Sequence, residues 1–309
     1  MSHIAKPKIG KPVFPWQIQL SPWQRFRRAP AEFLVQWLDK RRTAPADCAS
    51  VSPPAGTPPI RIVCISDTHN KQPSVPDADI LLHAGDLTNN GTFEELKAQL
   101  DWLKSLPHKH KVVVAGNHDR LLDAEYVDRF PDRIYEGPGT SRSDLDWGDL
   151  IYLNDTTTDL RLPGCRTLSI YGSPLTEQCG TFAFQYPPIR DVWNNRIPDE
   201  TDVILGCPQL LKEIWRVRPR LVVFGHIHAG YGQRVIPYDD GAEAAYASVF
   251  MRARGVFAAC SMVWHIMLQE ARGLLQSIFG SSNELPFGMI VNAALMSGDG
   301  TRDPLTVQL

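Results

Sequence analysis

The sequence predicts an α/β protein whose polar functional residues lie at the ends of buried strands. Three short apolar segments, at residues 62–65, 80–84 and 112–115, have the length and composition of such strands. Each is followed at once by side chains that can bind a metal ion: Asp67 and His69, then Asp86, then Asn117 and His118. Ligands of open α/β sheets bind beyond the carboxyl ends of the strands, so these side chains are expected to meet in one crevice.

A helix is predicted between the second and third of these strands. Its apolar residues recur at helical spacing: Phe93, Leu96, Leu100, Leu103 and Leu106. Thr92 can cap the helix, Glu95 completes a capping box, and Pro107 ends it. A strand-helix-strand crossover joins two parallel strands, which places Asp86 and Asn117 at the same edge of the sheet. Gly85 and Gly116 precede these two residues. Chain reversals beside a metal often need positive φ or a close backbone approach, so these glycines are expected to allow the turns.

A fourth apolar segment, residues 221–224, runs into Gly225, His226, Ile227 and His228. Further strands are predicted at residues 150–153, 167–171, 201–205, 287–295 and 304–309, with a polar turn region between the first two. A helix at residues 209–217 is bounded by prolines. An aromatic-rich loop can form either a substrate wall or local packing, and its aromatic residues are Phe182, Phe184, Tyr186 and Trp193.

Other histidines are expected to lie outside the site. His83 alternates away from the site along its strand and is expected to be structural. His108 and His110 lie in a Lys-flanked turn and are expected to be solvated.

Composition and charge argue against a nucleic-acid partner. The 309 residues have ordinary hydrophobic and charged content and a net charge of −2. Residues 1–42 hold nine Lys or Arg against Glu32 and Asp39, so this segment is basic (+7) and the remainder is acidic (−9). Duplex nucleic acid binds mainly through Lys and Arg, so an acidic body argues against such a partner. The six cysteines show neither a paired framework nor a C-x-x-C spacing, which favours a reducing, cytoplasmic location.

The predicted organisation is one domain with two added segments. Residues 1–59 form an N-terminal extension and Pro-rich linker, and residues 60–309 form the domain, with a variable insertion at 233–285. Residues 30–42 can form a short helix with an apolar side and a basic end, and residues 256–268 form an apolar run. Both are expected to pack on the domain, the alternative being a membrane-surface anchor. No stretch is long and apolar enough for a confident membrane span.

Four motifs occur in a fixed order at the predicted strand ends. They are Asp67-Thr68-His69, Gly85-Asp86, Gly116-Asn117-His118-Asp119 and Gly225-His226-Ile227-His228. Taken singly, their residues could be turn formers or strand-end polar groups. In this order they resemble the calcineurin-like metallophosphoesterase superfamily, and within it the metallophosphoesterase-domain (MPPED-like) branch. The resemblance covers most of residues 61–232 and a last strand near residue 309.

The resemblance implies a four-layer αββα sandwich, in which two mixed β-sheets pack face to face with helices on both outer faces. It also implies a centre for up to two divalent metal ions, of the kinds Mn, Fe, Zn or Mg. By resemblance the metal ligands are Asp67, His69 and His228 for one ion, Asp86 as the bridge, and Asn117 and His226 for the second.

The resemblance gives two further residues a catalytic part. His118 would act as a general acid or orient the phosphate, and Asp119 would fix the tautomer of His118.

One family feature is missing from the sequence. In the resembled family, the strand corresponding to residues 201–205 ends in a metal-binding His, whereas here Leu205 is followed directly by Gly206, Cys207 and Pro208. The loss can be an evolved one or can reflect a missing exon. In either case the second metal site is expected to be weak and turnover reduced.

The predicted function is metal-dependent hydrolysis of a small phosphodiester or phosphomonoester, such as a nucleotide. The alternative is a catalytically impaired descendant that binds a nucleotide or a protein partner through the same cleft. Protein phosphatases of the superfamily carry an Asp-Arg pair after the Gly-Asp motif, and residues 85–91 lack it. That substrate class is therefore disfavoured.

Overall fold

The computed structural model describes residues 21–28, 30, 33, 59–164, 166–206, 210–238, 264, 267–268, 271, 287–297 and 300–309. These residues fall into two compact units. One holds the described residues up to 33 and from 264 to 271, including helix α1 (Pro22–Arg28). The other holds the described residues from 59 to 238 and from 287 to 309. The helices predicted over 30–42 and 256–268 lie almost wholly outside the described residues, and the domain limits at 59 and 233–285 stay predictions.

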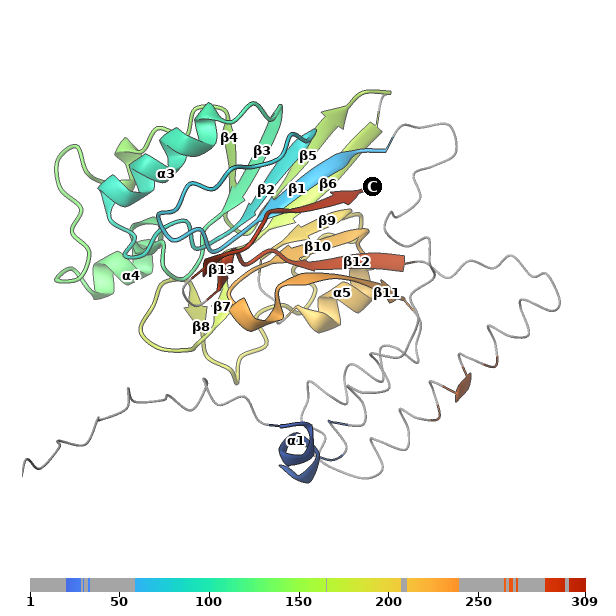
Figure 1. Ribbon diagram of the computed structural model, residues 1–309. Helices are drawn as coiled ribbons and strands as arrows, with labels where there is room; N and C mark the ends of the chain where they lie inside the picture. The colour runs from blue at the N-terminus through green and yellow to red at the C-terminus, as the bar shows by residue number, and fades with distance from the viewer. Residues whose placement is uncertain are drawn as a thin grey trace, which may run out of the picture. The chain divides into compact units, whose positions relative to one another are not determined.

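The larger unit contains two mixed β-sheets (Figure 1). The first sheet has the order β15-β1-β2-β3-β4. Four of its strands run parallel: β1 (Arg61–Ile65), β2 (Ile80–Ala84), β3 (His110–Val114) and β4 (Leu150–Leu153). Strand β15 (Leu305–Gln308) pairs antiparallel with β1 at the edge. The carboxyl ends of β1, β2 and β3 therefore lie at one edge of this sheet.

The second sheet has the order β11-β12-β10-β9-β6-β5. Its four central strands are parallel: β12 (Phe287–Asn292), β10 (Leu221–Phe224), β9 (Val203–Leu205) and β6 (Arg166–Gly172). The two edge strands are antiparallel to their neighbours: β11 (Gly232–Pro237) and β5 (Thr156–Leu162). Two small sheets pair β7 (Thr176–Glu177) with β8 (Gln185–Tyr186), and β13 (Met296–Ser297) with β14 (Gly300–Thr301).

The core lies between the two sheets and continues under the helices. Successive strand residues face opposite sides, so the central strands β1, β2 and β3 of the first sheet bury residues on both faces. Inward residues such as Cys64 and Val114 belong to one cluster with Leu205 and Val223 of the second sheet. Outward residues such as Val63 belong to a second cluster with residues of α3 (Phe93–Ser105) and α4 (Ala124–Arg129). Helix α5 (Leu211–Val217) lies on the other outer side (Figure 1). The predicted four-layer αββα arrangement is confirmed.

Helix α3 forms where the sequence predicts it. The Thr92 side chain accepts a hydrogen bond from the Glu95 N–H (3.3 Å), which caps the first turn. Leu96, Leu100 and Leu103 are buried, as the helical spacing requires. The helix joins β2 to its parallel neighbour β3. Asp86 and Asn117 therefore follow adjacent strand ends, as the crossover rule predicts.

Several features differ from the sequence-based expectation. A polar turn region was expected between residues 153 and 167, but most of it forms strand β5. Because β5 is an edge strand in which only Leu160 and Leu162 are buried, its sequence is polar and predicts a turn. Strand β11 and helix α4 were likewise not predicted. His108, expected to be solvated, is 3% exposed, and its Nε2 lies 2.9 Å from the Pro76 carbonyl oxygen. None of the helices in the described part of the chain combines the length and apolar character that crossing a bilayer requires.

Candidate metal centre

Strand ends from both sheets converge on the predicted site residues. Asp67 and His69 follow β1, Asp86 follows β2, and His226 follows β10 of the other sheet. Each of these four residues has a positive φ, between 44° and 64°. Such left-handed conformations are uncommon outside glycine, and they turn the chain sharply at the point where each side chain leaves its strand. Backbone bonds join the first two loops, since the His69 N–H donates to the Asp86 carbonyl (3.1 Å).

Glycines allow these loops to approach one another closely. Gly85 has a φ of +100°. A Cβ on Gly116 would lie 2.3 Å from Asp86 Oδ1, and a Cβ on Gly225 would lie 2.1 Å from Asp67 Oδ2. The expected roles of Gly85 and Gly116 are therefore confirmed, and Gly225 has the same role beside Asp67.

Asp67, His69 and His228 form a tight cluster of candidate ligand atoms, all within 4.8 Å of one another. His228 Nε2 lies 2.9 Å from Asp67 Oδ1, and His69 Nε2 lies 4.0 Å from the same oxygen. His69 Nδ1 lies 3.1 Å from the Thr88 carbonyl oxygen, so Nδ1 carries the proton and Nε2 keeps its lone pair. Metal-ligating histidines are typically held in this way by a bond to the other ring nitrogen. These three residues are those assigned to the first ion by resemblance.

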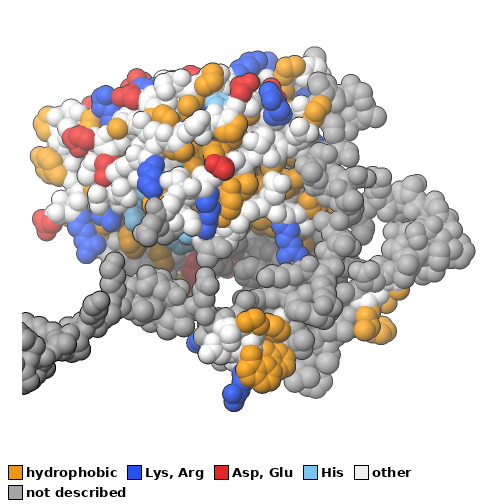
Figure 2. All heavy atoms as spheres, in the orientation of Figure 1, with side chains coloured by type: hydrophobic (Ala, Val, Ile, Leu, Met, Phe, Trp, Pro, Cys, Tyr) orange, Lys and Arg blue, Asp and Glu red, His pale blue; other side chains and the backbone are white. Residues whose placement is uncertain are grey.

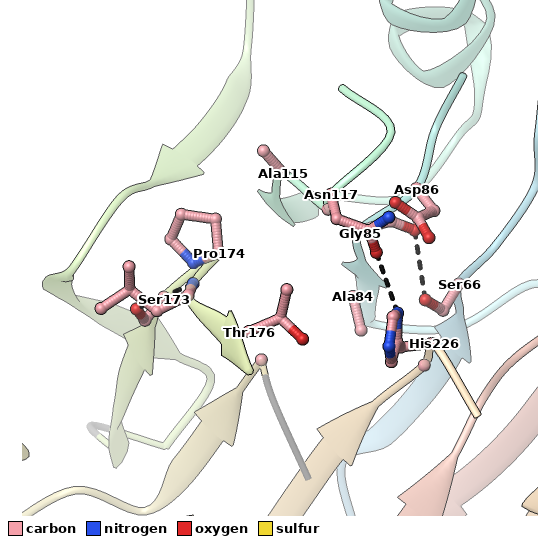
Figure 3. Close-up of a pocket in the computed structure, with 14 residues that line it drawn as sticks. Ser66, Ala84, Gly85, Asp86, Ala115, Asn117, Ser173, Pro174, Thr176 and His226 are labelled. Carbon is pink, nitrogen blue, oxygen red and sulfur yellow. Dashed lines mark hydrogen bonds between the residues drawn. The ribbon is translucent and has the colours of Figure 1, made fainter. Parts of the chain in front are cut away.

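Asp86, Asn117 and His226 line a neighbouring pocket (Figure 3). His226 Nδ1 lies 2.8 Å from Asn117 Oδ1, and Asp86 Oδ1 accepts a hydrogen bond from the His118 N–H (2.8 Å). The opposite wall consists of Ser173, Pro174, Leu175 and Thr176, which follow β6. The three ligands assigned to the second ion thus share one pocket with a wall of hydroxyl and apolar side chains.

Strand β9 lies between β6 and β10 in the second sheet, and it ends at Leu205. The next residue, Gly206, lines the pocket. A Cβ at this position would lie 2.4 Å from the Ser173 carbonyl oxygen. Among the described residues, this strand therefore delivers no ligand to the pocket, although its neighbour β10 does. Cys207, which follows Gly206, lies outside the described residues.

His118 lies against the first cluster. Its ring centroid is 4.9 Å from that of His69 and 5.0 Å from that of Phe182. His118 Nδ1 lies 2.7 Å from the Asn89 carbonyl oxygen, so this carbonyl holds the ring and selects the tautomer with the proton on Nδ1. Nε2 of the neutral His118 ring then carries the lone pair.

Asp119 takes a different position from the predicted one. Its Oδ1 accepts hydrogen bonds from the Thr88 N–H (2.9 Å) and hydroxyl (2.7 Å). Its Oδ2 accepts from the N–H groups of Gly116 (2.8 Å) and Leu87 (3.2 Å). The carboxylate thus braces the loop that carries Asp86, and the Asn89 carbonyl rather than Asp119 fixes the His118 tautomer. Every residue has a backbone carbonyl, so the sequence does not indicate that those of Asn89 and Thr88 hold His118 and His69.

The centre holds an excess of buried negative charge. Burial, and then the charges of Asp67 and Asp119, raise the pKa of Asp86 well above its usual value. Burial also raises the pKa of Asp119. Burial acts on Asp67 in the same direction, but bonds and charge from His228 outweigh it and lower the pKa of Asp67. Among the described residues, Asp67 pairs only with His69 and His228, and neither Asp86 nor Asp119 forms an ion pair.

This donor set fits divalent cations. Buried carboxylates without Lys or Arg partners are unfavourable unless a cation neutralises them. Burial lowers the pKa of His69 and of His226, so both imidazoles are neutral and able to coordinate. Carboxylate, imidazole and amide oxygen ligands are those of Mn, Fe, Zn and Mg sites.

The aromatic loop after β7 was expected to form either a substrate wall or local packing, and most of its aromatic residues form local packing. Phe184, Tyr186 and Trp193 are buried and form local packing. Phe182 instead contacts the His118 ring, and the Arg120 guanidinium lies over Phe182 at 5.6 Å from its centroid.

The family model for calcineurin-like phosphoesterases matches residues 60–230. The chain belongs to the calcineurin-like phosphoesterase family. That match begins just before β1 and ends just after His228, so it contains every candidate ligand described above. The family uses divalent metals, in agreement with the Asp67, His69 and His228 cluster.

Several relatives are similar to this member of the calcineurin-like phosphoesterase family. "Probable rhamnogalacturonate lyase C" of Emericella nidulans is 36% identical over 91% of this chain, which is 26% of that protein. "Metallophosphoesterase domain-containing protein 1" of Homo sapiens is 35% identical over 56% of this chain and 61% of its own length. "UPF0046 protein K07C11.7" of Caenorhabditis elegans is 32% identical, over 59% of this chain and 68% of that protein. The chain thus spans about a quarter and about three fifths of the first two relatives.

Proposed function

We propose that this chain hydrolyses a small phosphodiester or phosphomonoester, such as a nucleotide, at the metal centre. The observation that carries the proposal is the cluster of Asp67, His69 and His228, whose ligand atoms lie within 4.8 Å of one another. Asp86, buried beside it and lacking a Lys or Arg ion pair among the described residues, supports a cation at the same place. Family membership supports a phosphoester as the bond that is cleaved.

In this proposal the metal ligands keep the grouping assigned to them by resemblance. Asp67, His69 and His228 would hold one divalent cation, and Asn117 and His226 the second, with Asp86 between the two. A bound divalent cation supplies Lewis-acid polarisation of the phosphoryl oxygen and lowers the pKa of a coordinated water.

His118 is the residue proposed to handle the leaving group. The Asn89 carbonyl accepts from Nδ1–H, so Nε2 is the nitrogen available to the substrate. With both ring nitrogens protonated, Nε2–H would donate to the phosphate or pass its proton to the leaving oxygen, and the ring would return to the neutral Nδ1–H form. Phe182 contacts the His118 ring, with the ring centroids 5.0 Å apart.

We further propose that the second ion binds more weakly than the first. The end of β9 contributes only Gly206 to the pocket lining, at the place where the resembled family has a metal-binding His. A half-site with three protein ligands leaves open positions and loses affinity. This feature also favours the alternative function, a non-catalytic protein that binds a nucleotide or a protein partner in the same cleft.

The test measures metal binding and turnover on the same full-length protein. After treatment with a chelator, Mn²⁺ is titrated by calorimetry, and hydrolysis of bis-p-nitrophenyl phosphate and p-nitrophenyl phosphate is followed. We expect one tight and one weaker site, with hydrolysis that depends on Mn²⁺. His228→Ala should remove the tight site and His226→Ala only the weaker one. Asp101→Asn, an exposed change on α3, is the control and should alter neither.

Each outcome decides between the functions. Two sites of equal affinity would contradict the weak second site. Tight binding of one ion with no hydrolysis of either ester would overturn the enzyme proposal in favour of the binding protein.

The charge distribution supports a small substrate. On the face drawn in Figure 2, Lys and Arg side chains of the described residues are interspersed with Asp and Glu side chains. Duplex nucleic acid is bound through clustered Lys and Arg, so this face is not of the type that duplexes favour.

A further inference from the structure

Glu95 joins two loops of the metal centre although it lies outside the centre itself. It occupies the first turn of α3. Its Oε2 accepts hydrogen bonds from the N–H groups of Asn90 (2.8 Å) and Gly91 (2.9 Å). Its Oε1 accepts from the side-chain amides of Asn70 (2.8 Å) and Asn90 (3.0 Å). Both oxygens are thus used, and all four of these partners are donors.

The first of the two loops carries His69. Asn70 follows it directly and has a positive φ of 67°. The Asn70 side-chain oxygen accepts from the Asn89 N–H (3.3 Å), and the Asn89 side chain donates to the His69 carbonyl (3.2 Å). The loop after β1 and the loop before α3 are therefore bonded to each other and, through Asn70, to Glu95.

The second loop carries the acceptor for His118. The Asn89 carbonyl oxygen lies 2.7 Å from His118 Nδ1. Asn90 and Gly91 follow Asn89 immediately, and Glu95 holds the N–H groups of both. Because the Asn90 N–H belongs to the same peptide group as the Asn89 carbonyl, a fixed N–H fixes the direction of that carbonyl.

We infer that Glu95 is a positioning residue, which orients His118 by holding the peptide between Asn89 and Asn90. The value of this orientation for catalysis rests on the proposed function, whereas the orientation itself does not. A carboxylate is required because only an acceptor on both oxygens can take four donors, and a glutamine would turn its NH₂ toward some of them. Capping of α3 alone would not need the bonds to Asn70 and Asn90, since Thr92 already caps the helix.

The test compares Glu95→Gln with Glu94→Gln in the full chain. Glu94 is exposed and lies in the same turn, so both changes remove one charge near the same helix end. The first readout is the tautomer of His118, from its ring nitrogen signals in protein labelled with ¹⁵N-histidine and assigned with His118→Gln. We expect the Nδ1–H tautomer in the wild type and in Glu94→Gln, and a mixture of tautomers in Glu95→Gln.

The second readout is turnover of bis-p-nitrophenyl phosphate. We expect Glu95→Gln to lower kcat by about 10- to 100-fold with little change in KM, as for other residues that orient a functional histidine. Glu95→Asp covers the case in which Glu95→Gln does not fold. It keeps the charge that suits a helix N-terminus, but its side chain is too short to reach both loops, so the tautomer mixture is expected there too.

The two proposals fail separately. A wild type without hydrolysis would remove the proposed function, and the NMR signals would still decide the role of Glu95. A single Nδ1–H tautomer in both Glu95 variants, with kcat equal to that of Glu94→Gln, would overturn the positioning role.

Discussion

His83 contacts the two loops that carry Asp67 and Asp86, and these contacts define its protonation state. It is fully buried in β2. Its Nδ1 accepts a hydrogen bond from the Gly85 N–H (3.2 Å), so the proton is on Nε2, which lies 3.0 Å from the Thr68 hydroxyl oxygen. Thr68 in turn donates to the Leu87 carbonyl (3.2 Å). A second proton on His83 would face an N–H donor, so the ring supports the site loops only when it is neutral.

We therefore expect acid to destabilise the protein through His83. Burial lowers the pKa of His83 from 6.5 to about 3. The unfolded chain then takes up the proton first, so this stability is fully present above pH 6.5 and is lost as the pH falls toward 3. Below pH 6.5 the free energy of unfolding should fall by up to about 1.4 kcal/mol per pH unit, the slope for the uptake of one proton on unfolding. Urea unfolding in chelator between pH 7 and 4.5 measures it, and a His83→Gln variant with an equally steep dependence would contradict it.

At the residue scale, the sequence predicts side chains better than it predicts their partners. The candidate ligands were recoverable because each follows an apolar strand, and the structure brings them to one place. The partner of His118 was not, because a backbone carbonyl such as that of Asn89 is present at every position. His108 was misjudged because its neighbours along the chain are charged, whereas its burial arises from distant residues.

At the scale of elements, Lys111 joins the end of α3 to two strands. This lysine of β3 is 2% exposed. Its Nζ donates to the carbonyl oxygens of Lys104 (3.0 Å) and Leu106 (3.1 Å), at the carboxyl end of α3. It also pairs with Asp149, next to β4 (2.8 Å). A cation in this position satisfies carbonyls that the helix leaves free and complements the helix dipole.

We expect Lys111→Met to destabilise the fold by about 2–3 kcal/mol, because two partly buried carbonyls lose a charged donor. The matched control is Lys97→Met, on an exposed face of the same helix, where Lys97 pairs with Asp101 (2.8 Å). Such an exposed pair contributes about 0.5 kcal/mol or less. Chemical denaturation of the three proteins gives both values, and equal losses in the two variants would refute the capping role of Lys111.

The predictability of an element depends on how much of it is buried. Strands β2 and β3 and helix α3 were predicted because burial imposes an apolar pattern on them. Strand β5 lacks that pattern, since it is an edge strand in which only two of the seven residues are buried. Its pairing with β6 follows from the hairpin that joins the two strands rather than from its own composition. Strand β11 occupies the corresponding position at the other edge of the same sheet.

At the scale of the whole larger unit, the metal centre connects the two sheets. Asp67 and His69 follow a strand of the first sheet, whereas His228 follows a strand of the second. The Asp67 carboxylate also accepts from the His226 N–H (3.0 Å). An ion held by these three residues would therefore fasten one sheet to the other at this edge.

Removal of metal should loosen this edge of the sandwich selectively. An ion whose free concentration is 100 times its dissociation constant stabilises the folded state by about 2.7 kcal/mol. We expect a chelator to lower the melting temperature by several degrees and to speed amide exchange in residues 225–231. The backbone of β5, at the far edge of the second sheet, should exchange at an unchanged rate. Uniform acceleration along the chain would argue against a local metal clamp. Hydrogen exchange followed by mass spectrometry distinguishes these patterns.

The bonds around Glu95 have a further consequence for the chemical ageing of the protein. Residues 90 and 91 are an Asn-Gly pair, the dipeptide most prone to deamidation, in which the glycine nitrogen attacks the asparagine side-chain carbonyl. Here the Gly91 N–H and the Asn90 side-chain amide both donate to Glu95. The attacking nitrogen and its target are thus held in place by the same carboxylate. Glu95, for which we propose a role in orienting His118, would by the same bonds slow spontaneous conversion of Asn90 to aspartate or isoaspartate.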